Sequence, residues 1–178
     1  MSAFVFGKMP GHGDFVARGL TAERRERLDA WLSQALNDAR ESLGHAFDAA
    51  YDRAPPWRFA YDDGEEGWAA GALAPSVDAA GRRFPLLAGR TNVVAEGATA
   101  VAEAVEAVLY EALTQGWTVD QVLAAAEDVP VTPASPVEGD RWWTVGGGAD
   151  DIAFPAATID GAAPPDLISR MLTCEAVR

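Results

Sequence analysis

The chain has 178 residues, 49% of them hydrophobic, which suits one soluble domain with a sizeable core. Its formal net charge of −13 argues against nucleic acid as a partner, because that binding depends on basic residues displacing counterions from phosphates. No stretch reaches the ~18 uninterrupted apolar residues of a membrane-spanning helix, and the N-terminus has no features of a secretory signal. A single cysteine, Cys174, allows no intramolecular disulfide, so we expect a cytoplasmic protein without membrane insertion.

The first half of the chain predicts a strand followed by a long helix. Residues 3–6 are an apolar run with strand character, ended by Gly7 and Pro10. Thr21 is a candidate N-cap, Gly44 a candidate end, and a further helical turn precedes Pro55. The apolar stripe of this helix should face the core; it consists of Leu28, Trp31, Leu32, Ala35, Leu36, Ala39 and Leu43.

The middle of the chain predicts strands at residues 57–61, 67–73 and 84–94. After Gly97 a helical period runs to Gly116, and Thr118 with Gln121 has the spacing of a capping box that opens a shorter helix. Between residues 91 and 140 there is no Lys or Arg but nine acidic residues, which predicts a strongly negative face. We favour a solvated face over a docking surface for a basic partner.

The last part of the chain predicts a strand at residues 142–145, closed by Gly146, Gly147 and Gly148, and a final helix at residues 166–172. If Trp142 and Trp143 lie in a strand, their rings point to opposite faces. Taken together, the elements predict a single α/β or α+β domain over residues 1–178, with helices packed on a mixed β-sheet.

Two blocks combine glycine, proline and charge with aromatic residues: GKMPGHGDFVARGL at 7–20 and PSVDAAGRRFPL at 75–86. Each adjoins an apolar stretch of strand character, so we place each where a strand meets a turn, the usual position of a contact surface. The pattern also leaves ion pairs open, because Arg82 or Arg83 could pair with Asp14 or Asp78. We favour a structural network over a functional one.

Signals for cofactor chemistry are weak. The metal-binding residue types His12, His45 and Cys174 show no zinc-site spacing, and Met9 follows Gly7 and Lys8 where a phosphate-binding loop needs Ser or Thr. We therefore expect no cofactor and no metal.

A small hydrolase is the enzymatic alternative, with Ser76 as nucleophile, His12 as base and Asp14 or Asp78 as orienting acid. Ser76 lies in P-S-V-D rather than in a G-x-S-x-G elbow, and Ser and Asp readily hydrogen-bond within turns. We favour the structural role for Ser76.

The two blocks occur in order with a Trp-bearing helix, APPWRF and WWTVGG. This ordered set resembles the TagF family, also called ImpM, associated with type VI secretion systems, over residues 4 to about 148. Departures are small: Met9 stands where a leucine is expected, and Gly11 and His12 occupy a variable-looking pair.

The resemblance implies a non-enzymatic cytoplasmic regulator, a post-translational repressor of type VI secretion whose partner is a forkhead-associated scaffold protein. A structural subunit of the secretion apparatus is the alternative. Lys8, Asp14, Arg82 and Arg83 are the polar candidates for partner contacts. The family-motif positions carried over are Gly7, Lys8, Pro10, Gly13, Asp14, Phe15, Pro75, Ser76, Asp78, Gly81, Arg82, Arg83, Phe84 and Pro85.

Overall fold

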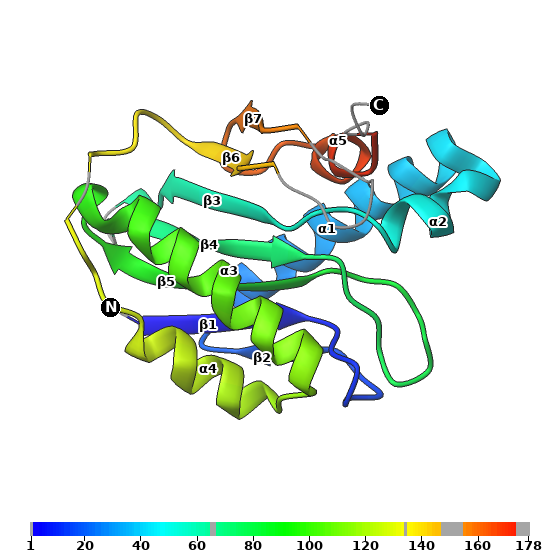
Figure 1. Ribbon diagram of the computed structural model, residues 1–178, viewed down its shortest axis with the longest axis horizontal. Helices are drawn as coiled ribbons and strands as arrows, with labels where there is room; N and C mark the ends of the chain where they lie inside the picture. Colours follow the sequence, from blue (N-terminus) through cyan, green and yellow to red (C-terminus); the bar gives the residue numbers. More distant parts are fainter. Residues whose placement is uncertain (1, 65–66, 134, 147–154, 174–178) are drawn as a thin grey trace.

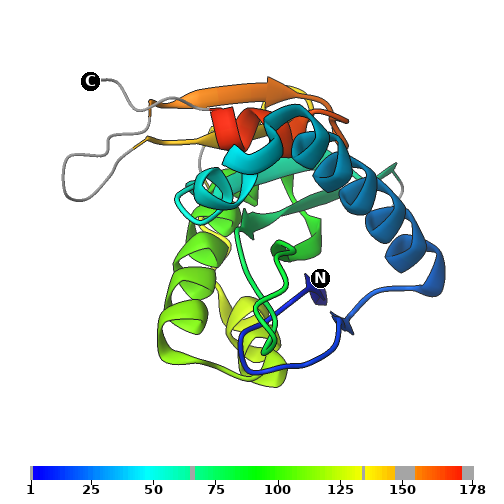
Figure 2. The ribbon, with the colours of Figure 1, turned by 90° about the vertical axis from the view of Figure 1, so that its right-hand side faces the viewer.

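A computed structural model describes residues 2–64, 67–133, 135–146 and 155–173. One seven-stranded sheet lies between two helical layers (Figures 1 and 2). Its strand order is β2-β1-β5-β4-β3-β6-β7, and every pairing is antiparallel. The strands are β1 (Ser2–Gly7), β2 (Val16–Arg18), β3 (Trp57–Asp62), β4 (Trp68–Ala74), β5 (Leu86–Val93), β6 (Arg141–Thr144) and β7 (Ala157–Asp160).

The helices are α1 (Ala22–Leu43), α2 (Phe47–Tyr51), α3 (Ala98–Gln115), α4 (Val119–Asp128) and α5 (Leu167–Thr173), with 3₁₀ turns η1 (Gly44–Ala46) and η3 (Ala95–Gly97). The expected fold class, helices packed on a β-sheet, is confirmed, but the sheet is antiparallel throughout its described strands rather than mixed. Two short strands, β2 and β7, were not predicted. Gly147, Gly148 and Cys174 lie outside the described residues.

Capping interactions fix the helix ends where the sequence predicts them. The Thr21 side chain accepts a hydrogen bond from the Arg24 N–H, and α1 ends at Gly44. Thr118 and Gln121 form the expected reciprocal capping box of α4. Gly116, at φ 68°, ends α3 in the left-handed conformation that glycine adopts without strain.

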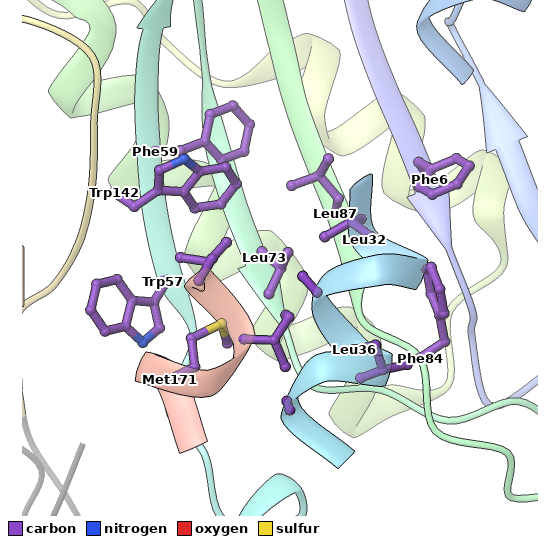
Figure 3. Close-up of a cluster of buried hydrophobic side chains, with 14 of the residues drawn as sticks. Phe6, Leu32, Leu36, Trp57, Phe59, Leu73, Phe84, Leu87, Trp142 and Met171 are labelled. Atoms are coloured by element: carbon purple, nitrogen blue, oxygen red, sulfur yellow. The ribbon is translucent and has the colours of Figure 1, made fainter. Parts of the chain in front are cut away.

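One face of the sheet carries large aromatic side chains. Figure 3 shows Phe6, Trp57, Phe59 and Trp142 beside aliphatic residues of α1 and Met171 of α5. Most of these rings are almost fully buried, so aromatic burial supplies much of this core. The predicted α1 stripe faces this layer, with Leu32, Ala35, Leu36 and Ala39 buried.

The opposite face carries small side chains beneath α3 and α4. Ala70, Ala72 and Ala74 alternate along β4, which lets α3 lie close to the sheet. As expected from their adjacency, Trp142 packs in the aromatic layer and Trp143 against the alanine-rich layer.

Two facing glycines make room for the aromatic layer at the centre of the sheet. Gly71 of β4 pairs with Gly89 of β5. A Cβ at Gly71 would lie 2.1 Å from the Ala88 carbonyl oxygen and 2.8 Å from the Phe59 ring, so no side chain fits there.

The acidic segment is partly used inside the fold. Arg58 of β3 binds Glu106 of α3 at 2.9 Å, and Glu127 of α4 accepts a hydrogen bond from the Ala3 N–H. Part of the predicted negative face therefore joins helices to the sheet. Among the described residues, none of the helices has the length and apolar character to cross a bilayer.

Candidate functional site

The two motif blocks lie side by side because β1 pairs with β5. Gly7, the first residue of the first block, is the partner of Leu86, the last residue of the second. Gly7 has φ 129°, and a Cβ there would lie 2.0 Å from the Pro85 carbonyl oxygen. This position therefore requires glycine, and the close approach brings both blocks to one edge of the domain.

Asp78 links the two blocks through a fully buried carboxylate. One oxygen accepts from Lys8 Nζ at 2.9 Å and from Arg82 Nε at 2.6 Å. The other accepts from the backbone N–H groups of Ala80 and Arg82, both at 2.9 Å. The Lys8 ammonium, together with these further donors, holds the pKa of Asp78 well below its usual range. The carboxylate thus stays ionised, joins the two blocks and closes its own turn.

Further hydrogen bonds join the blocks through the main chain. Arg82 Nη2 donates to the Gly13 carbonyl at 2.8 Å, and the Ala79 N–H donates to the His12 carbonyl at 2.9 Å. Arg82 therefore has a structural role on one side of its guanidinium, while 62% of its side chain remains exposed.

Ser76 belongs to the same network. Its Oγ donates to the Lys8 carbonyl at 2.7 Å, and the residue is 6% exposed. A buried hydroxyl committed to a carbonyl oxygen is an anchor of loop structure. The geometry of Ser76 thus favours the structural role over the hydrolase alternative with His12.

The C-terminal end of helix α2, at Tyr51 and the following Asp52, makes contacts with the second block that were not predicted from the sequence. The Tyr51 hydroxyl donates to the Ser76 carbonyl and accepts from the Ser76 N–H, each at 3.1 Å. Burial raises the pKa of Tyr51, so the hydroxyl remains a donor. Arg83 binds Asp52 bidentately at 2.8 and 2.7 Å, which lowers the pKa of Asp52. These contacts depend on how α2 packs, and no local motif signals them.

An exposed aromatic ring lies next to the hydrogen-bonded network around Asp78 and Ser76. Phe15 is 46% exposed and meets the buried Phe84 edge to face, with ring centroids 4.5 Å apart. Lys8 Nζ lies 5.4 Å from the Phe15 ring centroid, within range of a cation–π interaction. The cation on one side and the ring on the other hold Phe15 at the surface.

A groove of about 370 Å³ runs between the blocks and α1. The two blocks line it with the rings of Phe15 and Phe84 and with three basic side chains, those of Lys8, Arg82 and Arg83. Helix α1 adds Leu36, Asn37 and Arg40. Arg40 donates to the Arg83 carbonyl at 3.2 Å. The groove is thus rich in cations in a protein of net charge −13, with Asp29 as an acidic member of its lining. The α1 residues were not predicted as site residues, because their position follows from packing.

The remaining motif residues divide between turns and surface. Asp14 is exposed and takes no part in the ion pairs described above, so of the two predicted partners for the arginines the structure uses Asp78. Gly81 has φ 78°, as a tight turn requires, whereas Gly13 has no positive φ. Pro85 is buried, Pro75 half-buried and Pro10 exposed. No His, Cys, Asp or Glu cluster able to hold a metal occurs in the described part of the chain.

The fold and the site define an α/β protein in which hydrogen bonds and ion pairs join the two motif loops into one continuous surface. The family model for the TagF N-terminal domain, described as type VI secretion system-associated, matches residues 5–129 of this sequence. The chain therefore belongs to the TagF family. The crystal structure of PA0076 from Pseudomonas aeruginosa PAO1 is similar, with a TM-score of 0.76 and 27% sequence identity, over 99% of this chain and 96% of that one. No curated protein matches the sequence.

Proposed function

We propose that this protein is a non-enzymatic cytoplasmic regulator that represses a bacterial type VI secretion system post-translationally by binding a forkhead-associated scaffold protein. Membership of a type VI secretion-associated family gives the biological setting. The observation that carries the binding role is the exposed Phe15 ring, fixed by Lys8 and Phe84 beside a groove. A half-exposed aromatic residue on a rigid base is typical of an interface anchor.

The rigidity of the site supports binding rather than catalysis. Lys8, Ser76 and Asp78 are buried and bonded to one another or to the main chain. Side chains that are already fixed lose little conformational freedom on association, which favours affinity. The surface offered to the partner is then Phe15, the exposed edge of Arg82, and the α1 residues across the groove.

Secretion and co-purification together test the proposal. A strain that lacks the protein should export more effector, and the wild-type protein should restore repression and co-purify with the scaffold. Phe15→Ala should lose both activities, while Tyr110→Ala, an exposed aromatic position on α3, should retain them. Unchanged export after deletion, or full repression by Phe15→Ala without scaffold binding, would contradict the proposal.

A further inference from the structure

A second cavity lies on the aromatic face, under the N-terminal half of α1. No residue of the first ten in this helix, 22–31, is buried, although Leu28 and Trp31 continue its apolar stripe. The large rings of the aromatic layer hold α1 away from the strands, in contrast to the alanines beneath α3. Figure 2 shows α1 in blue, extending beyond the sheet at its N-terminal end. The result is a cavity of about 260 Å³.

The walls of this cavity are mostly aromatic and aliphatic. Phe4, Leu87 and Trp142 form a floor in which each residue is 1% exposed. Trp31 and Tyr61 form the sides; the Trp31 and Trp142 centroids are 5.5 Å apart, and Tyr61 stacks on Phe59 at 5.6 Å. Flat rings in fixed positions suit a planar, apolar ligand body.

Hydrogen bonds fix the tryptophan rings on this site. Trp31 Nε1 donates to the Pro164 carbonyl at 3.0 Å, and Trp142 Nε1 donates to the Ala162 carbonyl at 3.1 Å. Both carbonyls belong to the segment between β7 and α5, and Ala162 also lines the cavity. Because both indole N–H groups are used, the half-buried Trp31 meets the cavity through the apolar part of its ring, and Trp142 closes the floor behind it.

The mouth of the cavity carries two arginines and two aspartates, of which Asp62 accepts a hydrogen bond from the Gly64 N–H. Arg24 and Arg27 lie on the same side of α1 as Leu28 and Trp31. Arg24 forms an ion pair with Asp63, which neutralises that carboxylate. The Arg27 side chain is 67% exposed, and its pair with Glu23 spans 3.8 Å in solvent, so its guanidinium can turn to a ligand at little cost.

We propose that this cavity binds a small planar aromatic acid, with its ring against Trp31 and Tyr61 at the sides of the cavity and its anionic group on Arg27. The volume is slightly below the roughly 300 to 1,000 Å³ of drug-sized sites, so one or two fused rings fit and a nucleotide does not. An arginine is suited to a carboxylate because its fork of N–H donors matches the two oxygens.

The test uses 2-naphthoate as the probe and the indole N–H signals of the full chain in nuclear magnetic resonance. Saturable shifts of the Trp31 and Trp142 signals are expected, with Trp117 on the other face unmoved. A dissociation constant of about 1 mM or lower matches the binding energy per atom of small ligands. Absence of saturable shifts at Trp31 and Trp142 overturns the proposal.

Two variants separate the parts of the proposal. Arg27→Gln should weaken naphthoate binding about tenfold, as should replacing the probe by neutral 2-naphthamide, while the neighbouring exposed Arg25→Gln leaves it unchanged. Leu28→Trp should fill the cavity and abolish binding. If Arg27→Gln binds naphthoate like the wild type, or if a folded Leu28→Trp retains full binding, the assignment is wrong.

Discussion

Tyr51→Phe removes one oxygen atom and tests whether the second motif block is held by buried hydrogen bonds. The hydroxyl makes two bonds to Ser76, one to its carbonyl and one from its N–H, both at 3.1 Å. Phenylalanine keeps the ring packing against Phe47 but leaves the buried Ser76 N–H without the hydroxyl as acceptor, while the Ser76 carbonyl still accepts from the Phe84 N–H. An unsatisfied buried polar group costs about 1–3 kcal/mol, so we expect a loss of roughly 2 kcal/mol in the free energy of unfolding.

Urea denaturation measures this loss directly. With a slope of about 2 kcal/mol per molar, the midpoint should fall by roughly 1 M without a change in slope. Tyr110→Phe is the matched control, because that side chain is 73% exposed and should change the free energy by less than about 0.5 kcal/mol. A Tyr51→Phe variant as stable as this control would refute the claim that α2 braces the block.

Three further predictions concern the carboxylate, the sheet and a cap. Because the folded-state pKa of Asp78 is lowered, its contribution to stability is present above about pH 5 and is lost as pH falls below the unfolded value near 3.9; an acid titration of stability should therefore be flatter for Asp78→Asn. Gly71→Ala should destabilise the protein by about 1–3 kcal/mol in thermal unfolding, whereas Gly13→Ala, with open space around its Cβ position, should have little effect. Thr118→Ala should cost about 1 kcal/mol, measured by urea, and an unchanged midpoint would contradict the capping role.

The periodicity of apolar residues was sufficient to predict the long helices of this fold. The apolar stripes and caps of α1 and α3 are local properties, so the sequence shows both their extent and their ends. The edge strands β2 and β7 were missed because they have only three and four residues, and their pairing partners, not their own composition, make them strands.

The candidate site likewise combines contacts that the sequence predicts with contacts that arise only from the packing of distant segments. The Arg82–Asp78 pair lies within one block and was among the predicted alternatives. Lys8 reaches Asp78 only because β1 pairs with β5, a contact across 70 positions of sequence. The Tyr51 and Asp52 contacts arise from the packing of α2, and the groove arises from the position of α1, so neither follows from the motifs alone.

The measurement that tests the central claim most directly is the affinity of the purified protein for the forkhead-associated scaffold, determined by titration calorimetry for matched aromatic variants. The account predicts saturable binding by the wild type, a loss of roughly 30-fold or more for Phe15→Ala, and wild-type affinity for Tyr110→Ala. Absence of binding by the wild type, or equal affinities of the folded Phe15→Ala and wild-type proteins, would contradict it.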